Sequence, residues 1–344
     1  MASALLAASP LALGAPAAAS APAAASSSAW TGGRSCSPST DITGFSDALN
    51  KTTLAGAQVG ELSGLAVDAG GRRLLAVGDE SSLYTLDSRT LRPLTVRQLA
   101  DGAGQPLDSE AVTVDRDGTR LIASETEPSV VRFSRSGRYL GRLDTPAALR
   151  IAPAGRATAN QTFEGLALLP GSHTLVASME GALAGDDSGV RRLQTWRRTG
   201  GSGEFRPAAQ YAMRVDAGLN ISDIASTGDG RLLVVERGFT AGVGNTVRLY
   251  LADLARASDV RDVTTVSAGS PVRTARTTLL ADIADCPSLG ATAQQPQPNP
   301  LLDNIEGVTV LGRTHDGRLR LLLVSDDNGN ATQVTRLYRL TTRI

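Results

Sequence analysis

The sequence predicts an all-β protein with the architecture of a β-propeller. Three observations support this prediction. Pairs of short apolar strands joined by a tight turn recur along the chain, each pair is flanked by acidic residues, and each is followed by a more polar, alternating stretch. The pattern returns at intervals of roughly 50 to 80 residues, which is the length of four strands with their loops. A propeller arranges such units around a central channel, with buried inner strands and wetter outer strands.

Each unit consists of an acid, an apolar strand, a turn, a second apolar strand and another acid. The five visible units cover residues 61–80, 110–125, 164–180, 223–236 and 306–326. The turns contain glycine, in most cases paired with glycine or aspartate, and these residues accept the positive φ angles of tight hairpins. The two strands of each unit are therefore predicted to form a hairpin.

A third strand with one wet face is predicted in each unit, at residues 82–86, 129–133, 192–196, 246–250 and 335–340. A fourth strand fits most units, for example at residues 139–143. Five four-stranded blades are visible, and the long interval before the last unit leaves room for a sixth. Segment 47–59 is predicted to supply the outer strand of the last blade and so to close the ring. A β-sandwich fits poorly, because two packed sheets do not require five similar units.

Composition excludes several classes of protein. The chain has 344 residues, of which 41% are hydrophobic, and its 34 basic and 34 acidic side chains cancel. This is a globular composition, and it lacks the basic excess that a nucleic-acid or anionic-membrane partner requires. No apolar run is long enough to span a membrane. We expect a monomer that acts on a small molecule.

The first 29 residues are typical of an export signal. They contain no charged side chain, and an apolar stretch is followed by an Ala/Pro/Ser tract with A-x-A cleavage sites. The positive first region of a signal peptide is missing, so a low-complexity tail is the alternative. Residues 30–344 are expected to form a single extracellular or periplasmic propeller domain. In an exported protein, the only two cysteines, Cys36 and Cys286, are predicted to form a disulfide.

Acidic residues are predicted to converge at one rim of the channel. Each unit has one carboxylate before its innermost strand and another after the second strand, and antiparallel strands bring both ends to the same rim. The first set is Glu61, Glu110, Glu164, Asp223 and Glu306; the second includes Asp79, Glu80, Glu125, Glu180, Glu236, Asp326 and Asp327. For any single acid, the alternative is a strand-end carboxylate that accepts hydrogen bonds from turn amides.

So many carboxylates cannot stay ionised together without cations, because like charges at close range raise each other's pKa. Oxygen-only ligands select hard cations, and the flexible coordination of Ca²⁺ suits a carboxylate ring better than that of Mg²⁺, which is the second choice. Amide oxygens near the same rim could add ligands, from Asn160, Asn220, Asn304 and Asn328. The sequence therefore predicts a calcium site.

The usual organic nucleophile systems are absent from the sequence. His173 and His315 lie in hairpin turns, at the rim opposite the acids, and no G-x-S-x-G or P-loop is present. Metal-bound water is therefore the predicted nucleophile. Arg237 could hold an anionic substrate through its planar fork of donors, with an ion pair to neighbouring acids as the alternative.

Several segments resemble the family described as phytase-like, with "esterase-like activity of phytase". They are 303–308 with 323–328, 163–166 with 177–180, and 236–239. The resemblance covers about residues 55 to 341 and implies a secreted or periplasmic propeller with a phosphoesterase-type site. The residues that would form it are Glu110, Glu164, Glu180, Glu236, Glu306, Asp326 and Asp327. Gly329 follows Asn328 where the family has an aromatic residue, which puts a contact there in doubt. The acid-then-glycine strand start is also similar to calcium-dependent lactonase and paraoxonase propellers, an analogy of fold.

The sequence thus predicts a secreted, calcium-dependent hydrolase of phosphate esters, with a small anionic ester as substrate. The predicted catalytic residues are Glu164, Glu180, Glu236 and Arg237; the predicted metal ligands are Glu61, Glu110, Glu164, Asp223, Glu306, Asp326 and Asp327. Two alternatives stay open. The same site could hydrolyse carboxyl esters or lactones, or the protein could be a non-catalytic binding module that uses calcium for rigidity.

Overall fold

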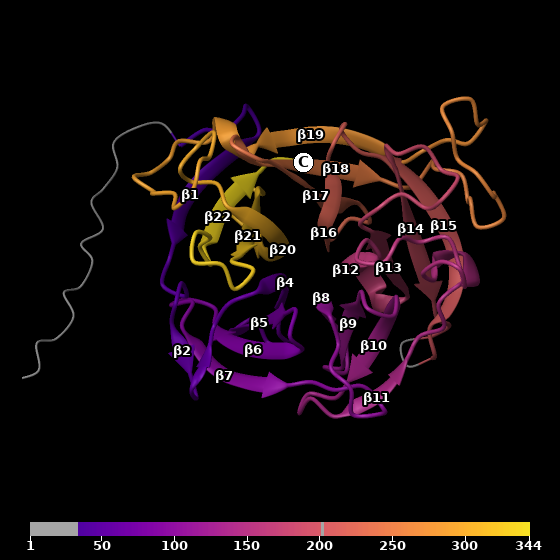
Figure 1. Ribbon diagram of the computed structural model, residues 1–344, viewed down its shortest axis with the longest axis horizontal. Coiled ribbons are helices and arrows are strands. Elements are labelled where there is room, and N and C mark those ends of the chain that lie inside the picture. Colours follow the sequence, from indigo (N-terminus) through magenta and orange to yellow (C-terminus); the bar gives the residue numbers. More distant parts are fainter. Residues whose placement is uncertain (1–33, 201–202) are drawn as a thin grey trace, which may run out of the picture. The chain divides into compact units, whose positions relative to one another are not determined.

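A computed structural model describes residues 34–200 and 203–344, which form a five-bladed β-propeller (Figure 1). The predicted export segment 1–29 lies outside the described residues. Each blade is a four-stranded antiparallel sheet, which confirms the predicted fold and sets the number of blades at five. Three short 3₁₀ helices, Ala147–Leu149, Pro170–Ser172 and Ile283–Asp285, are the only helical elements in the described ranges. None of the helices described there is long and apolar enough to cross a membrane.

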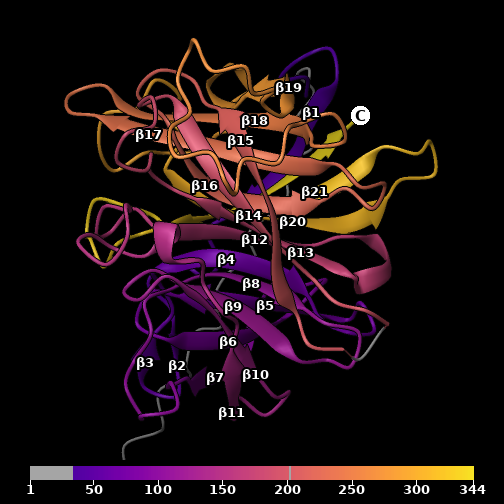
Figure 2. The same cartoon turned by 90° about the vertical axis from the view of Figure 1, so that its right-hand side faces the viewer.

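The first four blades follow the chain from the innermost strand outward. Their strands are β4 (Leu62–Val67), β5 (Arg73–Gly78), β6 (Ser82–Asp87) and β7 (Pro93–Gln98); β8 (Ser109–Val114), β9 (Arg120–Ser124), β10 (Ser129–Phe133) and β11 (Tyr139–Arg142); β12 (Phe163–Leu168), β13 (Thr174–Met179), β14 (Val190–Arg197) and β15 (Arg206–Arg214); and β16 (Asn220–Ser226), β17 (Leu232–Thr240), β18 (Gly244–Asp253) and β19 (Arg276–Asp282). Around the ring, the innermost strand β8 lies between β4 and β12, and all three strands are seen in Figure 2.

The fifth blade joins the two ends of the described chain. It contains β20 (Asn304–Arg313), β21 (Leu319–Asp326), β22 (Leu337–Thr342) and, as its outer strand, β1 (Thr40–Ser46). The prediction that segment 47–59 closes the ring was therefore wrong, although closure by an N-terminal strand is correct. Lys51 and Ala55 have positive φ angles, which interrupt an extended strand, and the segment instead holds a short hairpin of β2 (Thr53–Leu54) and β3 (Ala57–Gln58).

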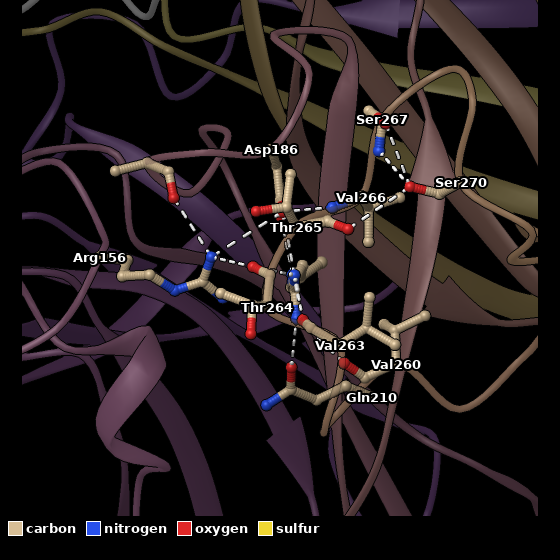
Figure 3. A network of polar contacts seen from close by, with 12 residues as sticks. Arg156, Asp186, Gln210, Val260, Val263, Thr264, Thr265, Val266, Ser267 and Ser270 are labelled. Carbon is tan, nitrogen blue, oxygen red and sulfur yellow. Dashed lines mark hydrogen bonds and ion pairs between the residues drawn. The ribbon is translucent and has the colours of Figure 1, made fainter.

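The long interval before the last blade contains no sixth blade. Residues 254–275 connect β18 to β19 as a loop whose backbone is hydrogen-bonded to a buried ion pair of blade 3. The Nε of Arg192 donates to Asp186 Oδ2 at 2.7 Å, and Asp186 Oδ1 accepts from the backbone N–H of Val266 at 2.8 Å. Figure 3 shows Asp186 and Arg156 contacting the loop around Thr264 to Val266. These polar contacts hold the insertion against the outer side of the propeller.

A disulfide between Cys36 and Cys286 confirms the predicted pairing and spans 250 residues of sequence. Cys286 follows β19 of blade 4, whereas Cys36 precedes β1 of blade 5. The hydroxyl of Thr40 adds a hydrogen bond to the carbonyl of Leu280 at 3.1 Å. The disulfide and this hydrogen bond therefore fasten the closing strand to the neighbouring blade.

Removing the disulfide is expected to destabilise the protein strongly. A cross-link that closes so long a loop restricts the unfolded chain, and loss of such bonds typically costs about 2–5 kcal/mol. Urea unfolding of the Cys36→Ala/Cys286→Ala variant measures the free energy of unfolding against that of the wild type. An unchanged unfolding midpoint would show that ring closure rests on the β1–β22 pairing alone.

The innermost strands approach one another so closely around the channel that side chains are excluded at certain positions. A Cβ at Gly64 would lie 2.6 Å from the carbonyl oxygen of Glu110, and one at Gly307 would lie 2.9 Å from the carbonyl oxygen of Ser63. This close approach explains why glycine occupies these positions of the innermost strands. Further along the same strands, the channel is narrow and largely apolar, lined by residues such as Leu65, Val112, Leu166, Ile224 and Val308.

Candidate functional site

Every innermost strand carries a β-bulge at the same place, close to its first residue. The register breaks lie at Leu62/Gly64, Ser109/Val112, Phe163/Gly165, Ile221/Asp223 and Ile305/Gly307. A bulge leaves one residue out of the ladder and re-aims its side chain. Three of the bulged residues, Glu110, Glu164 and Glu306, line a pocket at the channel mouth, and two serines, Ser63 and Ser222, occupy the equivalent positions in blades 1 and 4.

The equivalences expected from the sequence alignment need correction in two blades. Glu61 was aligned with Glu110, but it lies two residues before the bulged Ser63 and thus matches Asp108 of blade 2. Asp223 lies one residue past the bulged Ser222. The glycines identify the correct register. Gly64 aligns with Gly165, so Ser63 aligns with Glu164.

The second set of side chains follows the second strand of each blade. In each blade, one residue of the second strand pairs with the innermost strand just before the bulge, and the next residue belongs to this second set. The paired residues are Gly78, Ser124, Met179, Glu236 and Ser325, and the residues that follow them are Asp79, Glu125, Glu180, Arg237 and Asp326. Four blades thus supply an acid here, and blade 4 supplies an arginine. Successive side chains of a strand point to opposite faces of the sheet, so the side chains of Glu236 and Arg237 point in opposite directions.

The pocket has a volume of about 570 Å³ and is lined by seven carboxyl groups and a single guanidinium, that of Arg237. The seven acids fall into three groups whose carboxylate oxygens lie within 4.8 Å of one another: Asp79, Glu110 and Glu306; Asp108, Glu110 and Glu125; and Glu125, Glu164 and Glu180. Glu110 and Glu125 each belong to two groups. The acids therefore form one continuous chain around the channel mouth.

These residues fit the coordination chemistry of calcium. Two oxygens that each lie 2.3–2.6 Å from one Ca²⁺ ion are at most about 5 Å apart, which the three groups satisfy. The donors are all oxygens, and amide side chains of Asn160, Asn304 and Asn328 line the same pocket. The predicted position of Asn160, Asn304 and Asn328 at the acidic rim is confirmed, and Asn220 contacts Glu180 there.

Hydrogen bonds orient the carboxylates around the pocket. The Ser63 hydroxyl lies 2.5 Å from Asp79 Oδ1 and 3.0 Å from Glu306 Oε2. Asn304 Nδ2 donates to Glu306 Oε1 at 3.0 Å, and Arg237 Nη2 lies 2.9 Å from the same oxygen. Glu306 is thus held by three neighbours. The backbone N–H of Thr162 fixes Glu125, donating to its Oε1 at 2.8 Å.

Burial and mutual repulsion raise the pKa of several of the pocket acids and so favour their protonated forms. Burial, followed by the charges of Asp79 and Glu306, raises the pKa of Glu110 well above its ordinary value, and burial does the same for Glu164. Burial raises the pKa of Asp79 to about 7 and that of Glu125 to about 7. Near neutral pH the pocket therefore favours either bound protons or bound cations.

The remaining residues predicted for the site lie around the pocket or away from it. Asp223 is buried and accepts hydrogen bonds from the backbone of Ile224 at 2.7 Å and of Val308 at 2.8 Å, so it links innermost strands. Glu236 lies outside the pocket lining and accepts from the N–H of Asp216 at 2.9 Å. Glu61 lines a second pocket with Glu80, and its own N–H donates to Asp327 Oδ1 at 2.9 Å.

Asp326 lies directly behind the pocket. Its Oδ2 accepts from Asn304 Nδ2 at 3.2 Å, and its Oδ1 accepts from the N–H of Asn328 at 2.7 Å. Burial, followed by the charge of Glu306, raises the pKa of Asp326 to about 9. Asp326 therefore orients two asparagines that line the pocket, one of which, Asn304, contacts Glu306.

Sequence reasoning missed several residues of the pocket. Asp108 was not among the predicted acids, and Asp79 and Glu125 were placed at the rim but not assigned as ligands. Asp108 could have been found as the acid two residues before Glu110, at the position of Glu61 in the first unit. Asn245 and Phe239 also line the pocket, and their contribution depends on a hairpin whose length the repeat pattern does not reveal.

The fold and the pocket together define a five-bladed propeller with a carboxylate-lined channel mouth. Residues 57–329 match the phytase-like family described as "Esterase-like activity of phytase". The chain belongs to this family, as its motifs indicated.

Comparison with solved structures finds matches at low sequence identity. A gluconolactonase from Xanthomonas campestris is 14% identical with a TM-score of 0.44, over 82% of this chain and 72% of that one. The WD40 repeats of RRP9 are 13% identical with a TM-score of 0.40, over 86% of this chain and 97% of that one. A search of curated proteins finds no match.

Proposed function

We propose that this protein is a calcium-dependent hydrolase of phosphate esters that acts in the carboxylate-lined pocket. The observation that carries the proposal is the continuous chain of seven acids, whose oxygens lie at distances that one cation can bridge. Membership of a family named for esterase-like activity of phytase supports the class of reaction. We further propose that the protein is exported, a proposal supported by the disulfide, since such bonds persist in oxidising compartments.

The metal-holding residues of the proposal are Glu110, Glu125 and Glu164 in the middle of the acid chain, with Asp79, Asp108 and Glu306 beside them. A bound calcium ion would lower the pKa of a water ligand and polarise a phosphoryl oxygen. Glu61, Asp326 and Asp327 support this arrangement from outside the pocket lining, through backbone and asparagine contacts. Asp223 is proposed to hold the innermost strands together.

The chain's own side chains then position the ester and move protons. Arg237 presents a guanidinium to the pocket from the one blade that lacks an acid at this position, so it is proposed to bind the anionic group. Glu180 is proposed to donate a proton to the oxygen of the leaving alcohol as the P–O bond to that oxygen breaks. Burial raises its pKa, and Asn220 Nδ2 donates to its Oε1 at 3.1 Å, which fixes the orientation of the carboxylate.

Metal removal and restoration test this proposal. Protein treated with a chelator is expected to melt at a lower temperature, and added Ca²⁺ is expected to restore the melting temperature more effectively than Mg²⁺, because a ligand that binds only the folded state stabilises it. Turnover of p-nitrophenyl phosphate and of bis(p-nitrophenyl) phosphate should follow the same metal dependence.

Three other outcomes would contradict the proposal in different ways. Turnover of p-nitrophenyl acetate or of a lactone without phosphoester turnover would assign the pocket to carboxyl esters. Calcium stabilisation without turnover of any ester would indicate a binding module. No calcium effect on the melting temperature would exclude the acid chain as a metal site.

A further inference from the structure

The second hairpin of blade 4 continues past the channel rim where the other blades stop. The second strands of blades 1 to 3 end at Gly78, Ser124 and Met179. Strand β17 passes the equivalent residue, Glu236, and remains paired with β18 as far as Thr240 opposite Gly244. This extension forms a wall on one side of the acidic pocket.

One face of the extension carries three side chains toward the pocket. Arg237 and Phe239 are two residues apart on β17, and Asn245 of β18 lies directly opposite Phe239 in the ladder. Residues in these relations share a face of a sheet, and all three line the pocket. We call this face, formed by Arg237, Phe239 and Asn245, the blade 4 platform.

The platform is held rigidly by the loop before blade 5. The backbone N–H of Asn245 donates to Gln297 Oε1 at 2.8 Å. Gly244 has a φ of +111°, and a Cβ there would lie 2.5 Å from the carbonyl oxygen of Pro296, so only glycine allows the hairpin and the loop to approach this closely. The orientation of the platform is therefore set before any ligand arrives.

The platform also contains polar atoms that lack partners. Asn245 is 1% exposed, and its Nδ2 has no hydrogen-bond partner among the described residues; the same is true of the buried Nε of Arg237. A buried donor without an acceptor is costly, and in native proteins it is uncommon. Phe239, in contrast, is 57% exposed, so its ring is accessible to a ligand in the pocket.

We infer that the blade 4 platform is the subsite for the organic part of the substrate, and that it selects a phosphate ester with one anionic group and a flat apolar alcohol, such as an aryl group. In this arrangement Arg237 binds the anion, Asn245 donates to an ester oxygen, and the ring of Phe239 stacks on the flat group. A single guanidinium among the described pocket residues fits one anionic group rather than several. The inference rests on the proposed function, whose substrate class it narrows.

Binding of two non-hydrolysable probes to the calcium-loaded full chain tests the inference by titration calorimetry. Phenylphosphonate is expected to bind about fivefold more tightly than methylphosphonate, a ratio in the range of one aromatic contact. Phe239→Ala should bring this ratio close to one, and Phe239→Tyr should restore it. Asn245→Ala should weaken both probes by about fivefold, through the lost donor.

Val243 provides the matched control. It lies in the turn of the same hairpin and is 55% exposed, but it does not line the pocket, so Val243→Ala should retain the preference for phenylphosphonate. Equal affinity of the two probes for the wild type, no binding of either, or a preference that survives Phe239→Ala would each overturn the inference.

Turnover assays on the same samples separate this inference from the proposed function. Hydrolysis of phosphate esters without a phenyl preference would refute the platform and leave the function standing. A phenyl preference lost in Phe239→Ala, in a protein that hydrolyses no ester, would support the platform as a binding site for aryl anions and refute the hydrolase.

Discussion

Replacing Glu164 with glutamine is expected to lower phosphoester turnover by about 100- to 1,000-fold and to weaken calcium binding. Glu164 lies with Glu125 and Glu180 in one of the three acid groups, so the substitution removes a charge where the proposal places the cation. Changes around metal sites commonly cost about 10- to 100-fold in affinity or activity, and loss of a ligand itself costs more. Steady-state kinetics and calcium titration of the purified variant measure both effects.

Glu127→Gln is the matched control for this prediction. Glu127 lies two residues after Glu125 in the chain, but its side chain is mostly exposed and pairs with Arg142 outside the pocket. The same change of carboxylate to amide should therefore leave turnover and calcium binding unaltered. Equal behaviour of the Glu164→Gln and Glu127→Gln variants would show that the acid chain does not form the reaction site.

Without calcium, the protein is expected to become more stable as the pH falls from 8 to 5. Asp79 and Glu125 have pKa values of about 7 in the folded protein, whereas an unfolded carboxyl titrates at about 4. The folded state therefore binds these protons more tightly. This stabilisation is complete below the unfolded pKa and is lost as the pH rises through the folded pKa.

Acids whose pKa is lowered in the folded protein do not reverse this gain in stability between pH 8 and pH 5. The pKa of Asp87 and that of Asp117 are lowered by backbone hydrogen bonds, from Thr90 and Thr119 respectively, so these groups change the stability only in more acidic solution. We expect the melting temperature of chelator-treated protein to be about 5–10 °C higher at pH 5 than at pH 8. Saturating calcium should reverse the order, because the cation competes with protons for the same oxygens.

Thermal unfolding across this range, with chelator and with calcium, provides the measurement. A metal-free protein that is most stable at pH 8 would mean that the pocket acids stay ionised at little cost. A pH dependence that calcium does not alter would mean that cations bind elsewhere.

The sequence predicts the fold well because the hairpin repeat is local. Apolar strands joined by glycine-containing turns specify each blade, and the acids flanking them indicate one crowded rim. The bulges are harder to predict, because one inserted residue shifts which side chain enters the channel. This shift explains why Ser63, rather than Glu61, lies at the position of Glu164.

Other features of the site depend on contacts between distant segments. The blade 4 platform needs β17 and β18 to stay paired beyond the rim, and that pairing relies on Gly244 fitting against the loop at Pro296. The position of the ring-closing strand depends on the φ angles of Lys51 and Ala55, which composition does not determine. Local patterns therefore predict the blades, and long-range packing decides which side chains meet in the pocket.

Ring closure through β1 also determines when the protein can finish folding. The partner of β1 is β22, whose Thr342 pairs with Thr40 and is synthesised long after it. Until β22 arrives, β1 and β21 both present open strand edges, which are sites for wrong pairing with other chains. Contacts so distant in sequence also form slowly. Strand β1 must therefore wait for β22, so loss of either strand would leave the fifth blade unfinished.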